Sequence, residues 1–149
     1  MRNHEVKARQ PLLDETGALR EPGWSKSLVQ EYDRNKIKAP KFRIKEWDYY
    51  LVMNDEFAGA FTLSDDGYIG LQSVSLLNFK EGWEHTETIL NPFPMGKFHL
   101  PSTSEKGNIT YRDRRLHMKF IVSDGKRQIL CNFKYFFRGK PFSCKITLE

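Results

Sequence analysis

Two carboxylates with the spacing of a β-strand are the residues best placed to do chemistry. Glu46 and Asp48 lie two positions apart in the run Lys-Glu-Trp-Asp-Tyr-Tyr, so in a strand they point to the same face. That face is otherwise apolar, with Phe42, Ile44, Tyr50 and Val52. A carboxylate among apolar side chains is costly unless it is paired or functional, and a carboxyl group held protonated there can act as a general acid. Glu46 and Asp48 are therefore the candidate catalytic residues, for hydration, cyclisation or isomerisation of an apolar substrate.

A structural interpretation of the same two carboxylates competes with the catalytic one. Salt bridges to Arg43, Lys45 or other basic neighbours would neutralise them, and a bulge would turn them to the other face. Trp47, between them, resembles the tryptophan that closes the barrel floor in the first lipocalin strand, which favours a structural role for it.

The four histidines show no metal-ligand spacing. His85 and His99 flank a long loop and could converge with Glu84 or Glu87, but histidines at the surface are the more ordinary interpretation. No Ser-His-Asp order, phosphate-binding glycine loop or nucleotide fingerprint occurs in the sequence. We therefore expect no metal and no cofactor.

Three tight-turn signals divide most of the chain into antiparallel hairpins: Asp66-Gly67, Asp124-Gly125 and Gly139-Lys140. The second hairpin matches apolar with apolar residues in the pairs Phe120–Ile129, Met118–Cys131 and Leu116–Phe133, with Ser123 opposite Lys126. The first places Asp65 opposite Tyr68, Phe57 opposite Leu76 and Gly59 opposite Val74. The third places Phe137 opposite Phe142, Tyr135 opposite Cys144, Phe133 opposite Ile146 and Cys131 opposite Leu148. A slip of one residue would turn the apolar side chains to the wrong face, so the register is well specified.

The predicted third hairpin separates the only two cysteines. It sets Cys131 and Cys144 four residues apart along the ladder, which is about 13 Å and too far for a disulfide. Two reduced thiols packed in the core are the expected result.

These hairpins predict an all-β protein, an antiparallel meander that forms a barrel or a strongly curved half-barrel. Residues 41–149 form the β domain, and residues 1–40 form an irregular arm packed on the sheet. In the arm, Ser25 could cap a short helix. Residues 80–106, rich in proline and glycine, read as a long irregular loop.

The apolar concave face of such a barrel predicts a binding module for a small apolar ligand. The ligand-binding candidates on it are Tyr50, Phe120, Phe133 and Tyr135. This binding function is the first hypothesis, and the enzyme that uses Glu46 or Asp48 is the alternative.

A basic outer face gives a second alternative. The formal net charge is +5, and Lys119, Lys134, Arg138 and Lys145 alternate with the apolar positions. Such a face could bind nucleic acid or another anionic surface, but dispersed charges are more typical of an ordinary solvated surface. The sequence has no apolar signal segment and no stretch near the ~20 residues of a membrane span. We therefore expect a cytoplasmic protein.

Several longer runs resemble one bacterial family. These runs are Pro11 to Val52, with the distinctive Gly-Trp-Ser and Lys-Glu-Trp-Asp-Tyr-Tyr sequences, then Glu84 to Pro101, then Gly107 to Tyr111. They are similar to the family described as domain of unknown function 2804, and the resemblance covers nearly the whole chain.

The resemblance implies a larger architecture. Members of that family are roughly twice this length and look related to tandem lipocalin-like proteins, which include carotenoid hydratases and AttH-type proteins. The resemblance implies that this chain forms a lipocalin-like barrel or half-barrel that binds a lipid- or isoprenoid-like ligand. It also implies that the chain is the N-terminal half of a two-barrel protein and packs against a C-terminal half. The apolar strand that ends at Glu149 fits this expectation. The family has no assigned activity, so no catalytic residue carries over.

Overall fold

A computed structural model describes residues 3–149, which form ten β-strands and two single-turn 3₁₀ helices. The 3₁₀ helices are η1 (Arg34–Lys36) and η2 (Lys41–Arg43). The strands are β1 (Gln10–Pro11), β2 (Gln30–Glu31), β3 (Glu46–Met53), β4 (Phe57–Asp65), β5 (Ile69–Asn78), β6 (Trp83–Pro92), β7 (Ile109–Arg112), β8 (Leu116–Ser123), β9 (Lys126–Phe137) and β10 (Lys140–Leu148). No helix in this described part is long and apolar enough to cross a membrane.

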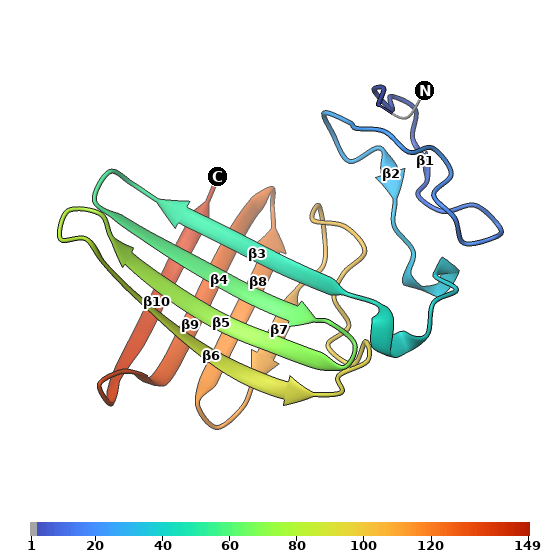
Figure 1. The fold of residues 1–149 in the computed structure, drawn as a ribbon. Coiled ribbons are helices and arrows are strands. Elements are labelled where there is room, and N and C mark those ends of the chain that lie inside the picture. The colour runs from blue at the N-terminus through green and yellow to red at the C-terminus, as the bar shows by residue number, and fades with distance from the viewer. Residues whose placement is uncertain (1–2) are drawn as a thin grey trace.

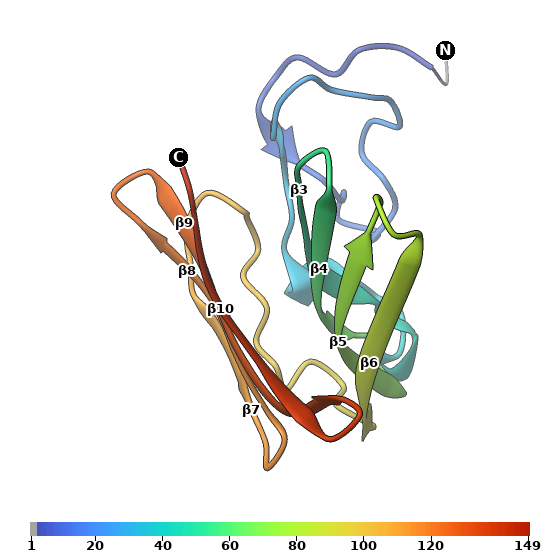
Figure 2. The ribbon, with the colours of Figure 1, turned by 90° about the vertical axis from the view of Figure 1, so that its left-hand side faces the viewer.

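Eight of the strands form two antiparallel meanders. One sheet has the order β3-β4-β5-β6 and the other β10-β9-β8-β7. The strands of one sheet cross those of the other at a steep angle (Figure 1), and the side view shows the two layers face to face (Figure 2). The all-β antiparallel meander predicted from the sequence is confirmed. It forms two separate sheets, and among residues 3–149 no strand of one sheet pairs with a strand of the other.

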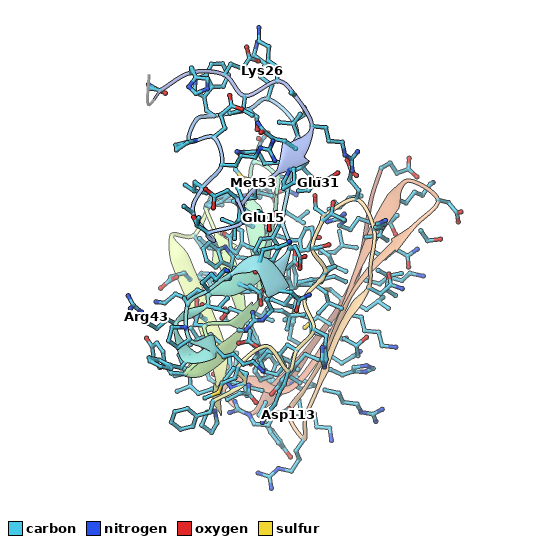
Figure 3. The ribbon with its side chains drawn as sticks, turned by 90° about the vertical axis from the view of Figure 1, so that its right-hand side faces the viewer. Glu15, Lys26, Glu31, Arg43, Met53 and Asp113 are labelled. Atoms are coloured by element: carbon cyan, nitrogen blue, oxygen red, sulfur yellow. The ribbon has the colours of Figure 1, made fainter. Side chains whose placement is uncertain are left out.

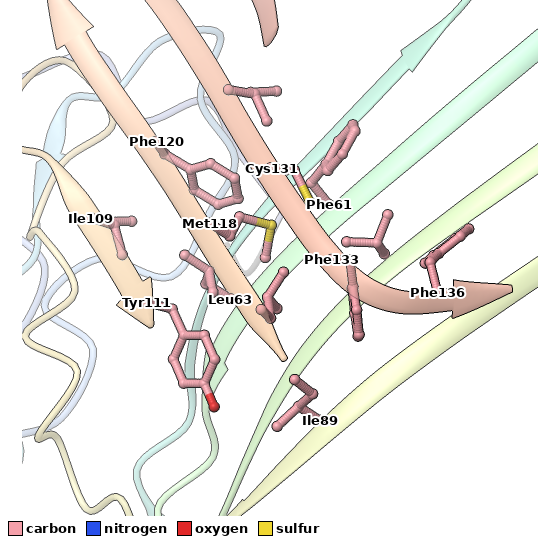
Figure 4. Close-up of a cluster of buried hydrophobic side chains, with 13 residues drawn as sticks. Phe61, Leu63, Ile89, Ile109, Tyr111, Met118, Phe120, Cys131, Phe133 and Phe136 are labelled. Atoms are coloured by element: carbon pink, nitrogen blue, oxygen red, sulfur yellow. The ribbon is translucent and has the colours of Figure 1, made fainter. Parts of the chain in front are cut away.

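The space between the sheets is filled with apolar side chains. Strand alternation sends every second side chain inward, and thirteen of these form one buried cluster (Figure 4). Phe61 and Leu63 of β4 meet Phe120 of β8 and Phe133 of β9, all nearly free of solvent contact. This core fixes which face of each strand is available for a site.

Two of the three predicted hairpins keep their faces. The β8–β9 pairs, from Ser123–Lys126 to Leu116–Phe133, are those predicted. The β4–β5 hairpin is shifted by two residues, so that Asp65 lies opposite Gly70 and not Tyr68. A shift of two preserves the inward and outward faces, because side chains alternate with period two.

The predicted register of the third hairpin is wrong. The turn lies at Arg138-Gly139, and an irregularity in β9 then places Phe142 opposite Phe133 and Cys144 opposite Cys131. Tyr135, predicted to face inward opposite Cys144, is 59% exposed, and Phe136 is buried instead. A β-bulge of this kind moves neighbouring side chains to the other face.

His85 of β6 fixes the bulge from the opposite sheet. Its Nε2 atom lies 2.7 Å from the carbonyl oxygen of Phe136, and its ring makes edge contacts with Phe136 and Phe137.

Replacing His85 by leucine should lower the free energy of unfolding by about 1–2 kcal/mol, because a bulge carbonyl loses its donor. Urea denaturation would measure this, and His85→Gln, which keeps an N–H group, should recover part of the loss. Equal stability of wild type and His85→Leu would contradict this role.

The N-terminal arm and the long loop differ from expectation. The helix predicted near Ser25 does not form, and the arm is extended, with β1 and β2 as a small parallel pair. Within the region predicted as irregular, β6 forms a ten-residue strand, and the loop is confined to residues 93–108. The Thr and Glu residues of β6 leave only a weak apolar alternation, so the sequence did not predict this strand. Its pairing with β5 makes it a strand.

Candidate functional site

A cleft of about 810 Å³ opens where three segments of the chain meet. Its walls are the arm, the first residues of β3 and the loop 100–106, and Glu31 of the arm faces that loop (Figure 3). The apolar part of the lining comprises Pro11, Leu13, Leu28, Trp47, Leu100 and Pro101. Both carboxylates singled out from the sequence, Glu46 and Asp48, also line it.

Strand β3 delivers these side chains in the predicted alternation. Glu46, Asp48, Tyr50 and Val52 are partly buried on the inner face, whereas the intervening residues from Trp47 to Met53 are exposed. The comparison with lipocalins suggested that Trp47 closes a barrel floor. Trp47 is 64% exposed, so it does not have that role. It forms part of the cleft wall.

Glu46 is committed to a structural ion pair. Its carboxylate pairs with the Arg34 guanidinium of η1 and accepts a hydrogen bond from the Tyr32 hydroxyl. The Arg34 guanidinium also lies against Gly96, whose N–H donates to the buried carboxylate of Asp65 at 2.7 Å. The Glu46 side chain is only 11% exposed, so this pairing satisfies it and ties the arm to the sheet. The salt-bridge interpretation therefore holds for Glu46, with Arg34 as the partner.

Asp48 is in a different situation. Burial raises the pKa of its carboxyl group, and the Arg127 guanidinium opposes that rise only in part. Among residues 3–149 Asp48 has no ion pair of its own within 4.0 Å. A partly desolvated carboxyl group in a cleft is a candidate for a general acid or for a group that hydrogen-bonds a ligand.

The raised pKa of Asp48 predicts a pH dependence of stability. Because the native state holds this proton at pH values where the unfolded state has lost it, stability falls as pH rises through the interval between the ordinary and the raised pKa. Asp48→Asn removes the effect. The variant should unfold at higher denaturant than wild type at about pH 7, and the difference should vanish near pH 3, where the carboxyl is protonated in both states.

Denaturant titrations at the two pH values measure this, with Asp55→Asn in an exposed turn as the control. A variant less stable than wild type at neutral pH would show that attraction to Arg127 outweighs burial.

Arg127 of β9 links the two sheets beside Asp48. Its guanidinium donates to the Tyr50 hydroxyl and to the backbone carbonyl of Ser104, and it lies 5.1 Å from the centre of the Tyr50 ring. The Tyr50 ring in turn makes an edge contact with Phe120, with 4.7 Å between ring centroids. Arg127 of β9 thus connects β3 and the loop 100–106, and it fixes their positions relative to each other.

Comparison with known protein families identifies the family of this chain. The profile of a family described as domain of unknown function, DUF2804, matches residues 3–149. The chain belongs to the DUF2804 family. Comparison with curated proteins gives no match, and comparison with solved structures gives none either.

In this DUF2804 chain the four predicted ligand-binding residues do not form one site. Tyr50 and Phe120 are in contact. Phe133 lies deep in the core, 1% exposed, and Tyr135 is on the outside because of the bulge. The cleft residues that the sequence reasoning missed, Leu28 and Leu100 above all, come from the arm and the loop, where no periodic pattern identifies a face.

The basic residues of the DUF2804 chain lie on the outer side of the second sheet. Lys119 and Lys145 flank Leu130 in one cross-strand row, whereas Lys134 and Arg138 are exposed near the β9–β10 turn. Burial and the neighbouring Lys119 lower the pKa of His117. His99, predicted to accompany His85, is exposed, and no group of three metal-ligating side chains occurs among residues 3–149.

Proposed function

We propose that this chain binds an apolar, lipid- or isoprenoid-like ligand with one polar end, and that the cleft receives it. The observation that carries the proposal is the size and lining of the cleft. Its volume of about 810 Å³ falls within the range of ordinary small-molecule sites, and six apolar residues stand in its lining beside polar and charged ones. A lipocalin-like relationship is part of the proposal, supported by two crossed meanders of four strands each.

The cleft fits such a ligand better than the space between the sheets. The core side chains between the sheets are each at most 9% exposed, so a ligand there would have to displace them. In the cleft, by contrast, Leu28 and Trp47 already present apolar surface to water, at 59% and 64% exposure. Covering that surface with an apolar ligand gains about 25 cal/mol per Å².

The polar end of the ligand would lie at Asp48. This carboxyl group lines the cleft without an ion pair of its own among the described residues, so a ligand hydroxyl can donate to it. The lining also holds charged side chains of both signs, with Lys45 and Lys106 among the basic ones and Glu31 and Glu105 among the acidic ones. An isoprenoid alcohol therefore suits the lining better than a fully apolar hydrocarbon.

Retinol, a fluorescent isoprenoid alcohol, is the probe for this proposal. Saturable binding should quench the fluorescence of Trp47 by energy transfer, and Trp47→Phe should remove most of that quenching. Leu28→Glu should weaken binding about fivefold or more, because it places a charge on an apolar wall. Leu19→Glu is the matched control, since Leu19 is a comparably exposed arm leucine outside the cleft. Absence of saturable binding, or equal losses in the two leucine variants, would refute the proposal.

An enzyme is the second candidate, favoured by the raised pKa of Asp48. A protonated Asp48 could give its proton to an alkene carbon while water adds to the neighbouring carbon and returns a proton to the carboxylate. The product would then exceed the substrate by the mass of one water molecule. Mass spectrometry of retinol recovered after incubation separates the two functions. Unchanged retinol supports the binding module, whereas a hydrated product that disappears with Asp48→Asn supports the enzyme.

A further inference from the structure

The two cysteines face each other across neighbouring strands. The bulge in β9 brings Cys131 directly opposite Cys144 of β10, and both thiols are free. Opposed residues of an antiparallel pair have Cα atoms about 4.5–5.5 Å apart, which lies within the Cα separations of disulfides. The sequence predicted that the two cysteines lie about 13 Å apart, but in the structure they are direct cross-strand neighbours.

The two thiols differ in access and in acidity. Cys131 is completely buried in the core, whereas Cys144 is only partly buried on β10, which has no neighbour on its other side in this sheet. A hydrogen bond from the Cys131 thiol lowers the pKa of Cys144, and the same interaction together with burial raises that of Cys131. Cys144 is therefore the thiol that can ionise and meet a reagent, and Cys131 stands directly behind it.

We propose that Cys131 and Cys144 are a reversible dithiol–disulfide pair, with Cys144 as the attacking thiol and Cys131 as the resolving thiol. The oxidant is a low-molecular-weight disulfide such as glutathione disulfide. The Cys144 thiolate attacks one sulfur of glutathione disulfide and releases one glutathione thiolate. The Cys131 sulfur then attacks the Cys144 sulfur, the bond to glutathione breaks, and the Cys131 proton passes to the departing sulfur, which leaves as the second glutathione. The protein loses two electrons and two protons, and one glutathione disulfide becomes two glutathione molecules.

The position of β10 makes closure feasible and reversible. Cross-strand Cβ atoms are about 4.5–5.5 Å apart, while a disulfide needs about 3.5–4.5 Å. The strands must therefore approach by about 1 Å. An edge strand can make this movement because no strand among residues 3–149 is paired to its far side in the sheet. A bridge that requires some strain is easier to reduce than a relaxed structural disulfide, which suits a reversible pair.

The test is to treat the folded, reduced protein with glutathione disulfide and to follow its mass. Wild type should lose the mass of two hydrogen atoms, resist alkylation after denaturation, and regain both thiols with dithiothreitol. Cys131→Ala should stop at a single glutathione adduct on Cys144. Cys144→Ala should remain unmodified while folded, because Cys131 is inaccessible, and should react once denatured.

Closure should also raise the midpoint of thermal unfolding, by about 5–10 °C for a loop of this length. Two outcomes would overturn the proposal: a wild-type protein that accumulates a stable glutathione adduct without closing, or one that does not react at all while folded. Both outcomes are read on wild type, so they do not depend on the folding of either variant.

Discussion

Replacing Phe133 by alanine is expected to cost about 3–5 kcal/mol of unfolding free energy, the value typical of a buried phenylalanine. Phe133 is 1% exposed, packs against Phe136 and lies under the Arg115 guanidinium. Tyr135, two positions later in β9, is 59% exposed, so Tyr135→Ala should change stability by about 0.5 kcal/mol or less. Urea denaturation followed by circular dichroism measures both variants.

This pair of variants tests the bulge directly. In a regular hairpin, residues 133 and 135 point to the same face, so both would lie on the apolar face and both alanine variants would be costly. In the bulged strand only Phe133 is in the core. Similar losses for the two variants would contradict the bulged register, and with it the direct opposition of Cys131 and Cys144.

The sequence contained enough information for hairpins whose register depends only on local matching. Asp124 and Gly125 both have positive φ, as a tight two-residue turn requires, and apolar parity fixes the pairs that follow. The predicted register of the β9–β10 hairpin was wrong because His85 holds the bulge in β9. The Nε2 atom of His85 lies next to the carbonyl oxygen of Phe136, which is 51 residues away in the sequence. No local pattern encodes a contact of that kind.

The same distinction applies to the candidate site. Alternation in β3 placed Glu46 and Asp48 on one face, and both line the cleft. Their different fates were not predictable, because they depend on Arg34 of the arm and Arg127 of β9. Arg127 reaches Tyr50 across 77 residues of sequence. Local pattern thus identifies a carboxylate on an apolar face, but only the tertiary partners decide which one stays unpaired.

Gly67 gives the second large expected effect, and it concerns the turn that supports the start of β3. Gly67 has φ of +77°, and a Cβ atom there would lie 2.5 Å from the carbonyl group of Phe42. Phe42 belongs to η2, the helical turn that leads directly into Glu46 and Asp48. An added methyl group must therefore displace backbone, which no side-chain movement can relieve. Gly67→Ala should cost about 2–4 kcal/mol, from left-handed strain together with the collision.

Gly125 is the matched control for Gly67. It has φ of +73° in another hairpin turn, but a Cβ atom there would meet nothing within 4 Å. Gly125→Ala therefore carries only the conformational strain, about 1–2 kcal/mol, and the difference between the two variants measures the collision alone. Because η2 would be displaced, Gly67→Ala should also weaken retinol binding, whereas Gly125→Ala should not. Equal destabilisation by the two variants would mean that the β4–β5 turn does not pack against η2, and the cleft would then lack the support that positions Asp48.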